Sequence, residues 1–353
     1  MNKRIGWLDT VRTAAIFFVV LNHGVEIIYD GSVPMSTFGT FFATTLFSLG
    51  RLGVPLFLFL SGYLLLSREY ASEKDCIAFW KTKWLPLLIC WEIWTAVYWV
   101  FFCLNRNEPM IISELIEQML MLRQSRMTHG WYLYMLLGLY PFFPLMANAL
   151  QRTGTRALAA LLLFAGLWTM GLPVVNDLVK LLGGKASYTG QLTLGLAGGI
   201  YGIMLVLGYL LTREDFFRLK TWQDLLGFGL CMGATVLWQV VKYRSGFDYR
   251  VWYSFPLLSL GALFLTDFLR KLDMGRLQPI FRLISECAFG IFLLHKPLQM
   301  LIRDTGIFLR MPESLAALTC TAMSFVLSLL GVWLLAKIPG VGKWLFLMKP
   351  GKK

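Results

Sequence analysis

Four charged or titratable side chains share one stripe of the apolar segment Trp7–Glu26. Arg12 and His23 are eleven residues apart, so a helix turning about 100° per residue places them on one face, about 16 Å apart along its axis. Asp9 falls near the same face, and Glu26 lies three residues after His23, within its reach. Charges at membrane depth usually face a polar interior, so the stripe predicts a functional site. The alternative is that Asp9 and Arg12 are snorkelling residues at the end of the span, or a pair that neutralises both charges in the membrane, and that His23 is an interfacial histidine.

The composition around this stripe is that of a membrane protein. The 353 residues are 57% hydrophobic and 15% charged, with a mean hydropathy of +0.62, which exceeds what a soluble domain of this size needs. Helices satisfy their own backbone in lipid, and the alternating pattern of barrel strands is absent from the sequence. We therefore predict an all-α polytopic transmembrane helical bundle whose surroundings are a lipid bilayer.

Ten hydrophobic spans can be counted, so both termini should lie on one side of the membrane. Lys and Arg are more frequent in the segments that share a side with the N-terminus, which predicts that both termini are cytoplasmic. The second span contains Gly50–Pro55 (GRLGVP) and is predicted to be broken there. We expect one integral-membrane domain over 1–340 and a short basic cytoplasmic tail over 341–353. The predicted spans are Trp7–Ile28, Phe41–Leu66, Trp84–Leu104, Gly130–Asn148, Ala157–Val175, Leu192–Leu211, Leu225–Val241, Trp252–Leu269, Ile280–Ile302 and Leu315–Ala336.

Charge and cysteine content narrow the class further. The net charge of +13 comes mainly from Lys and Arg in short loops, so it indicates membrane topology rather than binding of nucleic acid. The six cysteines are scattered, mostly within apolar spans, and no C-x-x-C occurs, so neither a zinc site nor a disulfide framework is indicated. No metal is expected.

The predicted topology places the only three histidines at a similar depth. His23 lies near the outer end of the first span, His129 opens the fourth from outside, and His295 lies in the outer half of the ninth. A shared cavity would produce this arrangement, although chance could also do so. The outer loop Asn105–Thr128, which precedes His129, contains an amphipathic stretch, IISELIEQMLMLRQ, that predicts an interfacial helix.

Four segments in order resemble the acyltransferase-3 family of integral membrane acyltransferases. The first span has the R-x10-H spacing of Arg12 and His23, and the second continues as GVPLFLFLSGYLLL (53–66). The fourth has HGWYLYMLLGLYPFFPLM (129–146), and the ninth has ISECAFGIFLLHKPL (284–298). The resemblance runs over most of the chain. It is greatest to the stand-alone subgroup that includes enterobacterial-common-antigen O-acetyltransferases.

The resemblance implies a multi-pass O-acyltransferase of the bacterial inner (plasma) membrane. The donor would be cytoplasmic acyl-CoA, usually acetyl-CoA, and the acceptor an envelope glycan or a lipid-linked sugar. His23 could be the base that deprotonates the acceptor hydroxyl, or a nucleophile that carries the acyl group. Glu26, Asp9 or a carboxylate of another helix could hold its tautomer. Arg12 could bind the phosphates or pantetheine of the cofactor, or stabilise the oxyanion.

Five further side chains are candidate contacts with substrates. Arg68 matches the basic pattern of the family only in part, so it is a cofactor contact or a plain positive residue of the inner face. Arg51, deep in the second span, could line the outer cavity and meet an anionic substrate. His129 and Trp131 are substrate contacts or interfacial anchors, and His295 could bond the acceptor.

A transporter or flippase for a small metabolite or a lipid-linked sugar is the alternative function. Ten spans, a broken helix and buried charges would serve it as well, but no inverted repeat is visible in the sequence. A homo-oligomer is possible under either function, and the sequence names neither the acceptor nor the acyl chain.

Overall fold

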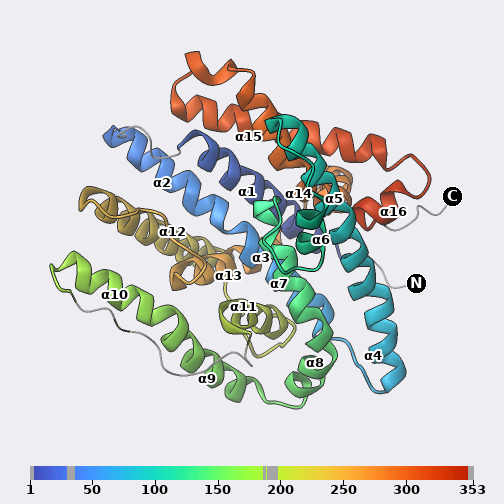
Figure 1. The fold of residues 1–353 in the computed structure, drawn as a ribbon. Coiled ribbons are helices and arrows are strands. Elements are labelled where there is room, and N and C mark those ends of the chain that lie inside the picture. The colour runs from blue at the N-terminus through green and yellow to red at the C-terminus, as the bar shows by residue number, and fades with distance from the viewer. Residues whose placement is uncertain (1–3, 30–35, 186–187, 189–197, 349–353) are drawn as a thin grey trace.

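The computed structural model describes residues 4–29, 36–185, 188 and 198–348, and all regular elements in these ranges are helical. Eight helical stretches among them are long and apolar enough to cross a membrane, which confirms the polytopic helical bundle (Figure 1). They are α1 (Gly6–Ile28), α2 with α3 (Thr37–Arg51, Gly53–Leu65), α4 to α5 (Glu73–Phe79, Leu85–Arg106), α7 with α8 (Trp131–Leu139, Phe143–Gln151), α9 with α10 (Thr155–Gly166, Leu172–Leu181), α12 (Thr221–Arg244), α14 (Gln278–Asp304) and α15 (Glu313–Leu335).

Two shorter helices account for the remaining predicted spans. α11 (Gly199–Leu210) covers most of the sixth span, whose residues 192–197 lie outside the described ranges, and α13 (Pro256–Lys271) covers the eighth. The amphipathic stretch that precedes His129 forms the helix α6 (Ile112–Met119), whose location at the membrane interface stays a prediction, and α16 (Val341–Phe346) follows α15.

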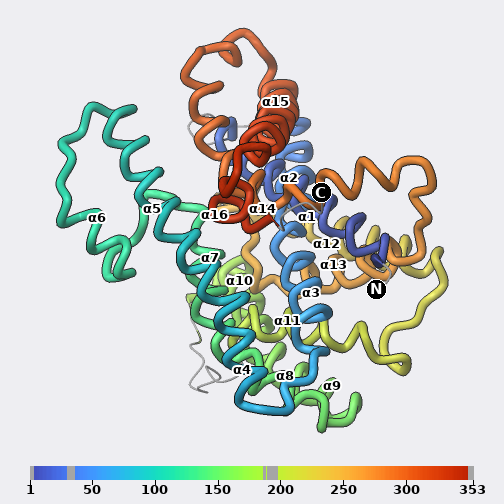
Figure 2. The backbone as a smooth tube through the Cα atoms, turned by 90° about the vertical axis from the view of Figure 1, so that its right-hand side faces the viewer, coloured from blue at the N-terminus to red at the C-terminus, as the bar shows by residue number. Residues whose placement is uncertain are grey.

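The long helix α1 lies at the centre of the bundle. It packs against α14, α2, α15 and α3, while α3 packs on α11 and α12 joins α13 to α2 (Figures 1 and 2). The approach of α1 to the second span depends on glycine. A Cβ atom on Gly50 would lie 2.6 Å from the Cα of Asn22, and one on Gly53 would lie 2.7 Å from the carbonyl oxygen of Ala15. Small residues thus bring the polar stripe of α1 close to α2, as is typical of membrane helices.

The predicted break in the second span is limited to one residue. Leu52 separates α2 from α3 but keeps right-handed helical dihedrals, φ −68° and ψ −22°. Its N–H still bonds to the carbonyl of Leu49, and the N–H of Leu56 bonds to the carbonyl of Leu52. The helix therefore continues past Pro55. The first N–H groups of a helix have no partner within it, so the N–H that a proline lacks costs no hydrogen bond near the start of α3.

Polar contacts join the helix ends that are predicted to lie on the same side of the membrane as the N-terminus. The Gln151 amide, at the end of α8, donates to the carbonyls of Leu66 (3.1 Å) and Arg68 (2.8 Å), after α3. Lys271, at the end of α13, donates to the carbonyl of Leu219 (2.7 Å), just before α12. Every second connection between spans therefore lies at the same end of the bundle, as an up-and-down topology requires. The compartment that this end faces stays a prediction.

Candidate functional site

The three histidines meet inside the bundle although they come from distant parts of the chain. The ring centroids of His23 (α1) and His295 (α14) are 5.2 Å apart. The ring centroid of His129 lies 5.9 Å from that of His23 and 5.1 Å from that of His295. His129 is 2% exposed and His295 is fully buried. The sequence predicted that the three histidines lie at a similar depth, and the structure shows that they also lie next to one another.

A proline in α14 explains how His129 is held. Pro297 has no N–H to bond with the carbonyl of Leu293, four residues earlier, so that carbonyl needs another donor. The Tyr98 hydroxyl, from α5, donates to it at 2.8 Å. The phenol has only one proton, so its oxygen accepts from Nε2 of His129 at 3.4 Å. Nε2 of His129 then carries the ring proton, and Nδ1 is left with a lone pair.

His295 has a fixed tautomer as well. Its Nδ1 lies 2.9 Å from the carbonyl oxygen of Ile291, which can only accept, so Nδ1 donates. Its Nε2 is buried and has no hydrogen-bond partner among the described residues, and the same holds for Nδ1 of His129. Buried polar atoms of this kind call for an explanation, and a bound substrate is one.

Glu26 is the carboxylate that orients His23. Its Oε2 lies 2.9 Å from Nδ1 of His23, and its Oε1 accepts from Nη2 of Arg51 at 3.1 Å. A carboxylate only accepts when ionised, so Nδ1 of His23 carries the proton and Nε2 has the free lone pair. Arg51 also donates to the Tyr253 hydroxyl at 3.3 Å, and it lies over the ring of Phe47 at 4.5 Å. The chain Tyr253–Arg51–Glu26–His23 thus fixes the imidazole and balances the negative charge.

A narrow pocket opens beside His23. Its cavity volume is about 10 Å³, which is room for roughly one water molecule. His23, His129 and Trp131 line it, together with Asn22 and Gly50, whereas His295 packs behind the other two imidazoles. The side-chain oxygen of Asn22 is buried there without a partner among the described residues. The pocket therefore presents a lone pair of His23 and an amide to whatever enters.

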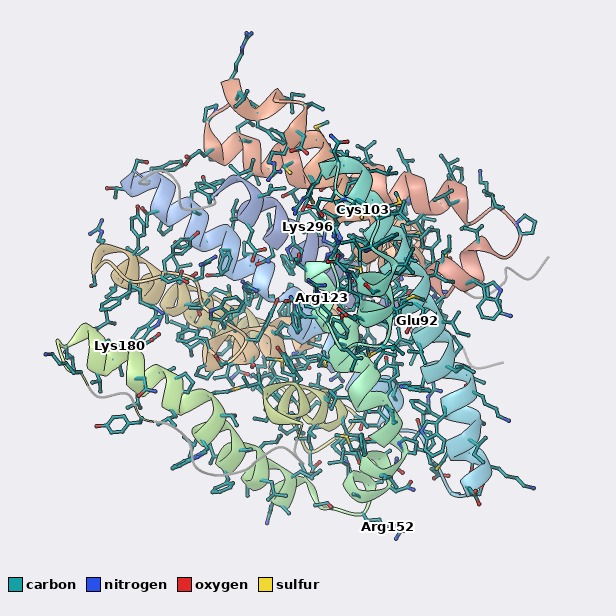
Figure 3. All side chains as sticks on the ribbon, in the orientation of Figure 1. Glu92, Cys103, Arg123, Arg152, Lys180 and Lys296 are labelled. Atoms are coloured by element: carbon teal, nitrogen blue, oxygen red, sulfur yellow. The ribbon has the colours of Figure 1, made fainter. Side chains whose placement is uncertain are left out.

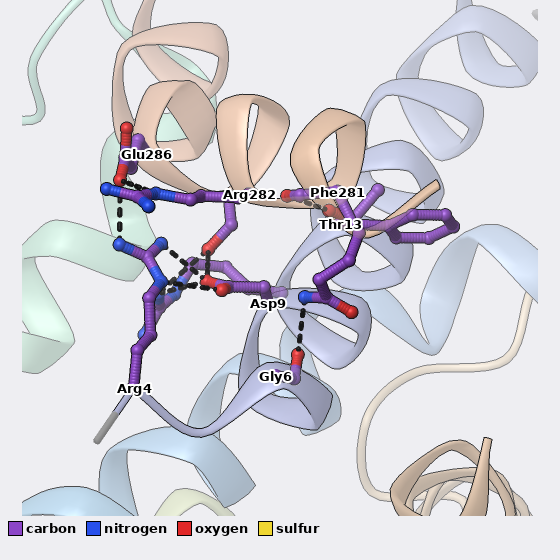
Figure 4. A network of polar contacts seen from close by, with 10 residues as sticks. Arg4, Gly6, Asp9, Thr13, Phe281, Arg282 and Glu286 are labelled. Carbon is purple, nitrogen blue, oxygen red and sulfur yellow. Dashed lines mark hydrogen bonds and ion pairs between the residues drawn. The ribbon is translucent and has the colours of Figure 1, made fainter. Parts of the chain in front are cut away.

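Asp9 and Arg12 belong to a second polar cluster, at the other end of α1 (Figure 4). Asp9 accepts from the guanidinium of Arg4 at 2.7 and 2.8 Å and from the Ser285 hydroxyl at 2.7 Å. Arg12 donates to the same hydroxyl at 2.9 Å, and its Nη1 lies 3.9 Å from Asp9. The prediction that Asp9 could orient His23 is wrong, because fourteen residues of helix separate them by about 21 Å.

Arg68 lies in neither cluster. Its side chain is exposed and donates to the carbonyl of Leu64, near the end of the preceding helix α3, at 3.0 Å. Arg51 lies in the site but pairs with Glu26, so its cation is already engaged there. Tyr98 and Tyr253 were not predicted from the sequence. Pro297 gave a signal for Tyr98, because it frees a carbonyl, but nothing in the sequence marks Tyr253.

Comparison with known proteins places these features in one family. Residues 5–337 match the family model Acyl_transf_3, described as an acyltransferase domain. No curated protein and no solved structure gave a significant match. Among the described residues, no group of three or more His, Cys, Asp or Glu side chains is arranged to hold a metal ion. The matched region covers nearly the whole chain, with the histidine pocket and the Arg12 cluster inside it: the chain belongs to the acyltransferase-3 family of membrane acyltransferases.

Proposed function

We propose that this acyltransferase moves an acetyl group from cytoplasmic acetyl-CoA to a hydroxyl of a cell-envelope acceptor, a glycan or a lipid-linked sugar. The observation that carries the proposal is the hydrogen bond from Nδ1 of His23 to Glu26, itself paired with Arg51, beside a narrow pocket. This arrangement leaves one imidazole lone pair, on Nε2, for the reaction.

In the direct route, Nε2 of His23 takes the proton of the acceptor hydroxyl as the oxygen attacks the thioester carbonyl. The carbon–oxygen bond forms, the carbon–sulfur bond breaks, and the proton then passes from Nε2 to the leaving thiolate. Glu26 stabilises the imidazolium formed between the two steps, at 2.9 Å from Nδ1.

In the two-step route, the same Nε2 attacks the thioester and carries the acetyl group to the acceptor. The carbon–sulfur bond breaks first and the thiolate leaves. The acceptor hydroxyl then attacks the acetyl carbon, the bond from that carbon to Nε2 breaks, and the proton of the hydroxyl passes through solvent to the thiolate. Both routes need the tautomer that Glu26 imposes. Rapid acid quenching with radiolabelled acetyl-CoA and no acceptor distinguishes them, because only the second route leaves label on His23.

Two groups support the donor side of the reaction. The Asn22 amide lines the pocket and can turn its N–H toward the oxygen of the tetrahedral intermediate, where a well-placed donor stabilises the developing charge. Arg12 lies about 16 Å along the helix from His23. That separation favours a contact with the phosphates or the extended pantetheine arm of the cofactor over a contact with the oxyanion.

The decisive experiment uses the full-length protein reconstituted in nanodiscs. Release of the free thiol from acetyl-CoA, and acetylation of an envelope glycan fraction detected by mass spectrometry, should occur with wild type and be lost in His23→Ala. A well-folded His23→Ala protein with full activity would overturn the assignment of His23. Acceptor uptake into proteoliposomes without any acyl donor would favour a transporter instead.

A further inference from the structure

A second pocket opens on the surface next to the histidine pocket. It lies between the loop that follows α6 and the start of α7, and holds about 620 Å³ of atom-free space that is open to solvent. Its walls combine the polar side chains of Arg123, Gln124 and Thr128 with apolar and aromatic ones, Met121, Leu122, Met127, Trp131 and Tyr134. Trp131 also lines the histidine pocket, so one indole separates the two spaces. Figure 3 labels Arg123 on the stretch between α6 and α7.

We propose that this outer pocket, called here the vestibule, binds the sugar ring of the acceptor. The inference rests on the proposed function and adds to it a subsite, a ligand class and a direction of approach. The pyranose ring lies against Trp131, and the hydroxyl that receives the acetyl group points past the indole toward His129 and His23.

The walls of the vestibule are held in place before any ligand binds. The Tyr134 hydroxyl accepts from the backbone N–H of Ser125 at 2.9 Å. Arg126 pairs with Glu108 and, at 3.2 Å, with Glu114, which ties the loop to α6. A preformed surface spares a weakly binding ligand the cost of ordering the loop.

The aromatic wall suits a sugar. Trp131 and Tyr134 line the vestibule, and the Trp131 ring makes tilted contacts, outside the vestibule lining, with Tyr201 at 5.5 Å and Tyr253 at 5.4 Å. A pyranose has a face of C–H groups that packs on such rings, and its hydroxyls bond to the polar groups at the rim. Gln124 is exposed at the rim and can bond to the hydroxyls of a sugar, whereas the guanidinium of Arg123 is already paired with Glu114 at 3.1 Å and Glu117 at 3.5 Å.

The histidine pocket, next to the vestibule, contains a buried acceptor atom that a hydroxyl can satisfy. Nδ1 of His129 is buried, lines the histidine pocket and has no hydrogen-bond partner among the described residues. Its Nε2 is engaged by Tyr98, so Nδ1 accepts and requires a donor. A second hydroxyl of the sugar, beside the one whose proton passes to His23, supplies that donor, whereas the hydrocarbon chain of a lipid does not. This difference selects a carbohydrate over an acyl chain as the occupant.

Photolabelling with a diazirine-bearing phenyl glucoside tests the binding without turnover. In nanodiscs, we expect label on the peptide that contains residues 121–134, at least fivefold less label with excess methyl α-D-glucopyranoside, and a similar loss in Trp131→Ala. Trp222→Ala, which removes an exposed tryptophan of α12, is the matched control and should label as wild type does. Label elsewhere, label that methyl glucoside does not compete, or stronger labelling by an alkyl diazirine would overturn the proposal.

Filling the vestibule with a bulky group tests its role, with the unmodified Gln124→Cys protein as the reference for the loss of the Gln124 side chain. Gln124→Cys, modified by a bulky impermeant maleimide, should lose at least tenfold in acetyl transfer to a glycan acceptor and keep thiol release from acetyl-CoA in water. Asp304→Cys, at the exposed end of α14, is the control for modification. Equal transfer by modified and unmodified Gln124→Cys would refute the vestibule. A wild type that releases no thiol and acetylates no acceptor would instead refute the proposed function, whatever the photolabel shows.

Discussion

The hydrogen bond between Glu26 and His23 makes the sharpest prediction, through the isosteric change Glu26→Gln. A hydrogen bond to a charged group contributes about 1.5–3 kcal/mol. If it strengthens as His23 becomes an imidazolium, its loss lowers kcat about 10- to 150-fold, at about 1.36 kcal/mol per tenfold. The Gln amide can also donate to Nδ1 of His23 and move the ring proton to Nε2, which removes the reactive lone pair. We therefore expect the upper end of this range or beyond.

The assay is steady-state thiol release and acetyl transfer by the full-length protein in nanodiscs. KM for acetyl-CoA should change little, because Glu26 contacts His23 and Arg51 rather than the pocket. Glu313→Gln, the same chemical change at an exposed position at the start of α15, should keep the wild-type rate.

A second variant tests whether Glu26→Gln lowers the rate by misorienting His23 or by disrupting the fold. Arg51→Gln leaves Glu26 with its bond to His23 but without its guanidinium partner. If both act through one chain of contacts, the double variant should be far less impaired than the product of the two single effects. Additive effects, or a folded Glu26→Gln protein within threefold of the wild-type kcat, would refute the reasoning.

Three further predictions concern the centre and the packing. His23→Ala should abolish acetyl transfer while thermal unfolding stays unchanged within a few degrees, and retained transfer would contradict its role. Gly62→Ala should destabilise the protein by about 1–3 kcal/mol because its Cβ would collide with the carbonyl oxygen of Leu205 in α11, whereas Gly138→Ala, with open space around it, should be neutral or slightly stabilising. Lys271→Met should destabilise by about 3–5 kcal/mol because it leaves the buried carboxylate of Asp224 without its cation, while Asp267 keeps Arg270 at 3.6 Å; equal melting temperatures in detergent would contradict either packing prediction.

The sequence alone determined the class of protein and the position of its reactive helix. Hydropathy sets the spans because the bilayer demands about twenty apolar residues per helix, and each predicted span coincides with helix among the described residues. The i, i+3 spacing of His23 and Glu26 is local, so helical geometry fixed that contact before any packing was known. The same periodicity placed Asp9 on the stripe, but a rise of about 1.5 Å per residue puts it about 21 Å from His23, too far for the suggested contact, and Asp9 bonds to Arg4 and Ser285 instead.

Only the tertiary structure decided which distant groups complete the site. Arg51 reaches Glu26 because Gly50 and Gly53 let α2 and α3 approach α1, and Tyr98 reaches His129 because Pro297 frees a carbonyl on a helix that packs beside both. Such contacts join residues far apart in sequence, and they depend on the rotation and depth of each helix. Neighbouring side chains set those two quantities, since lipid contacts any apolar face about equally well.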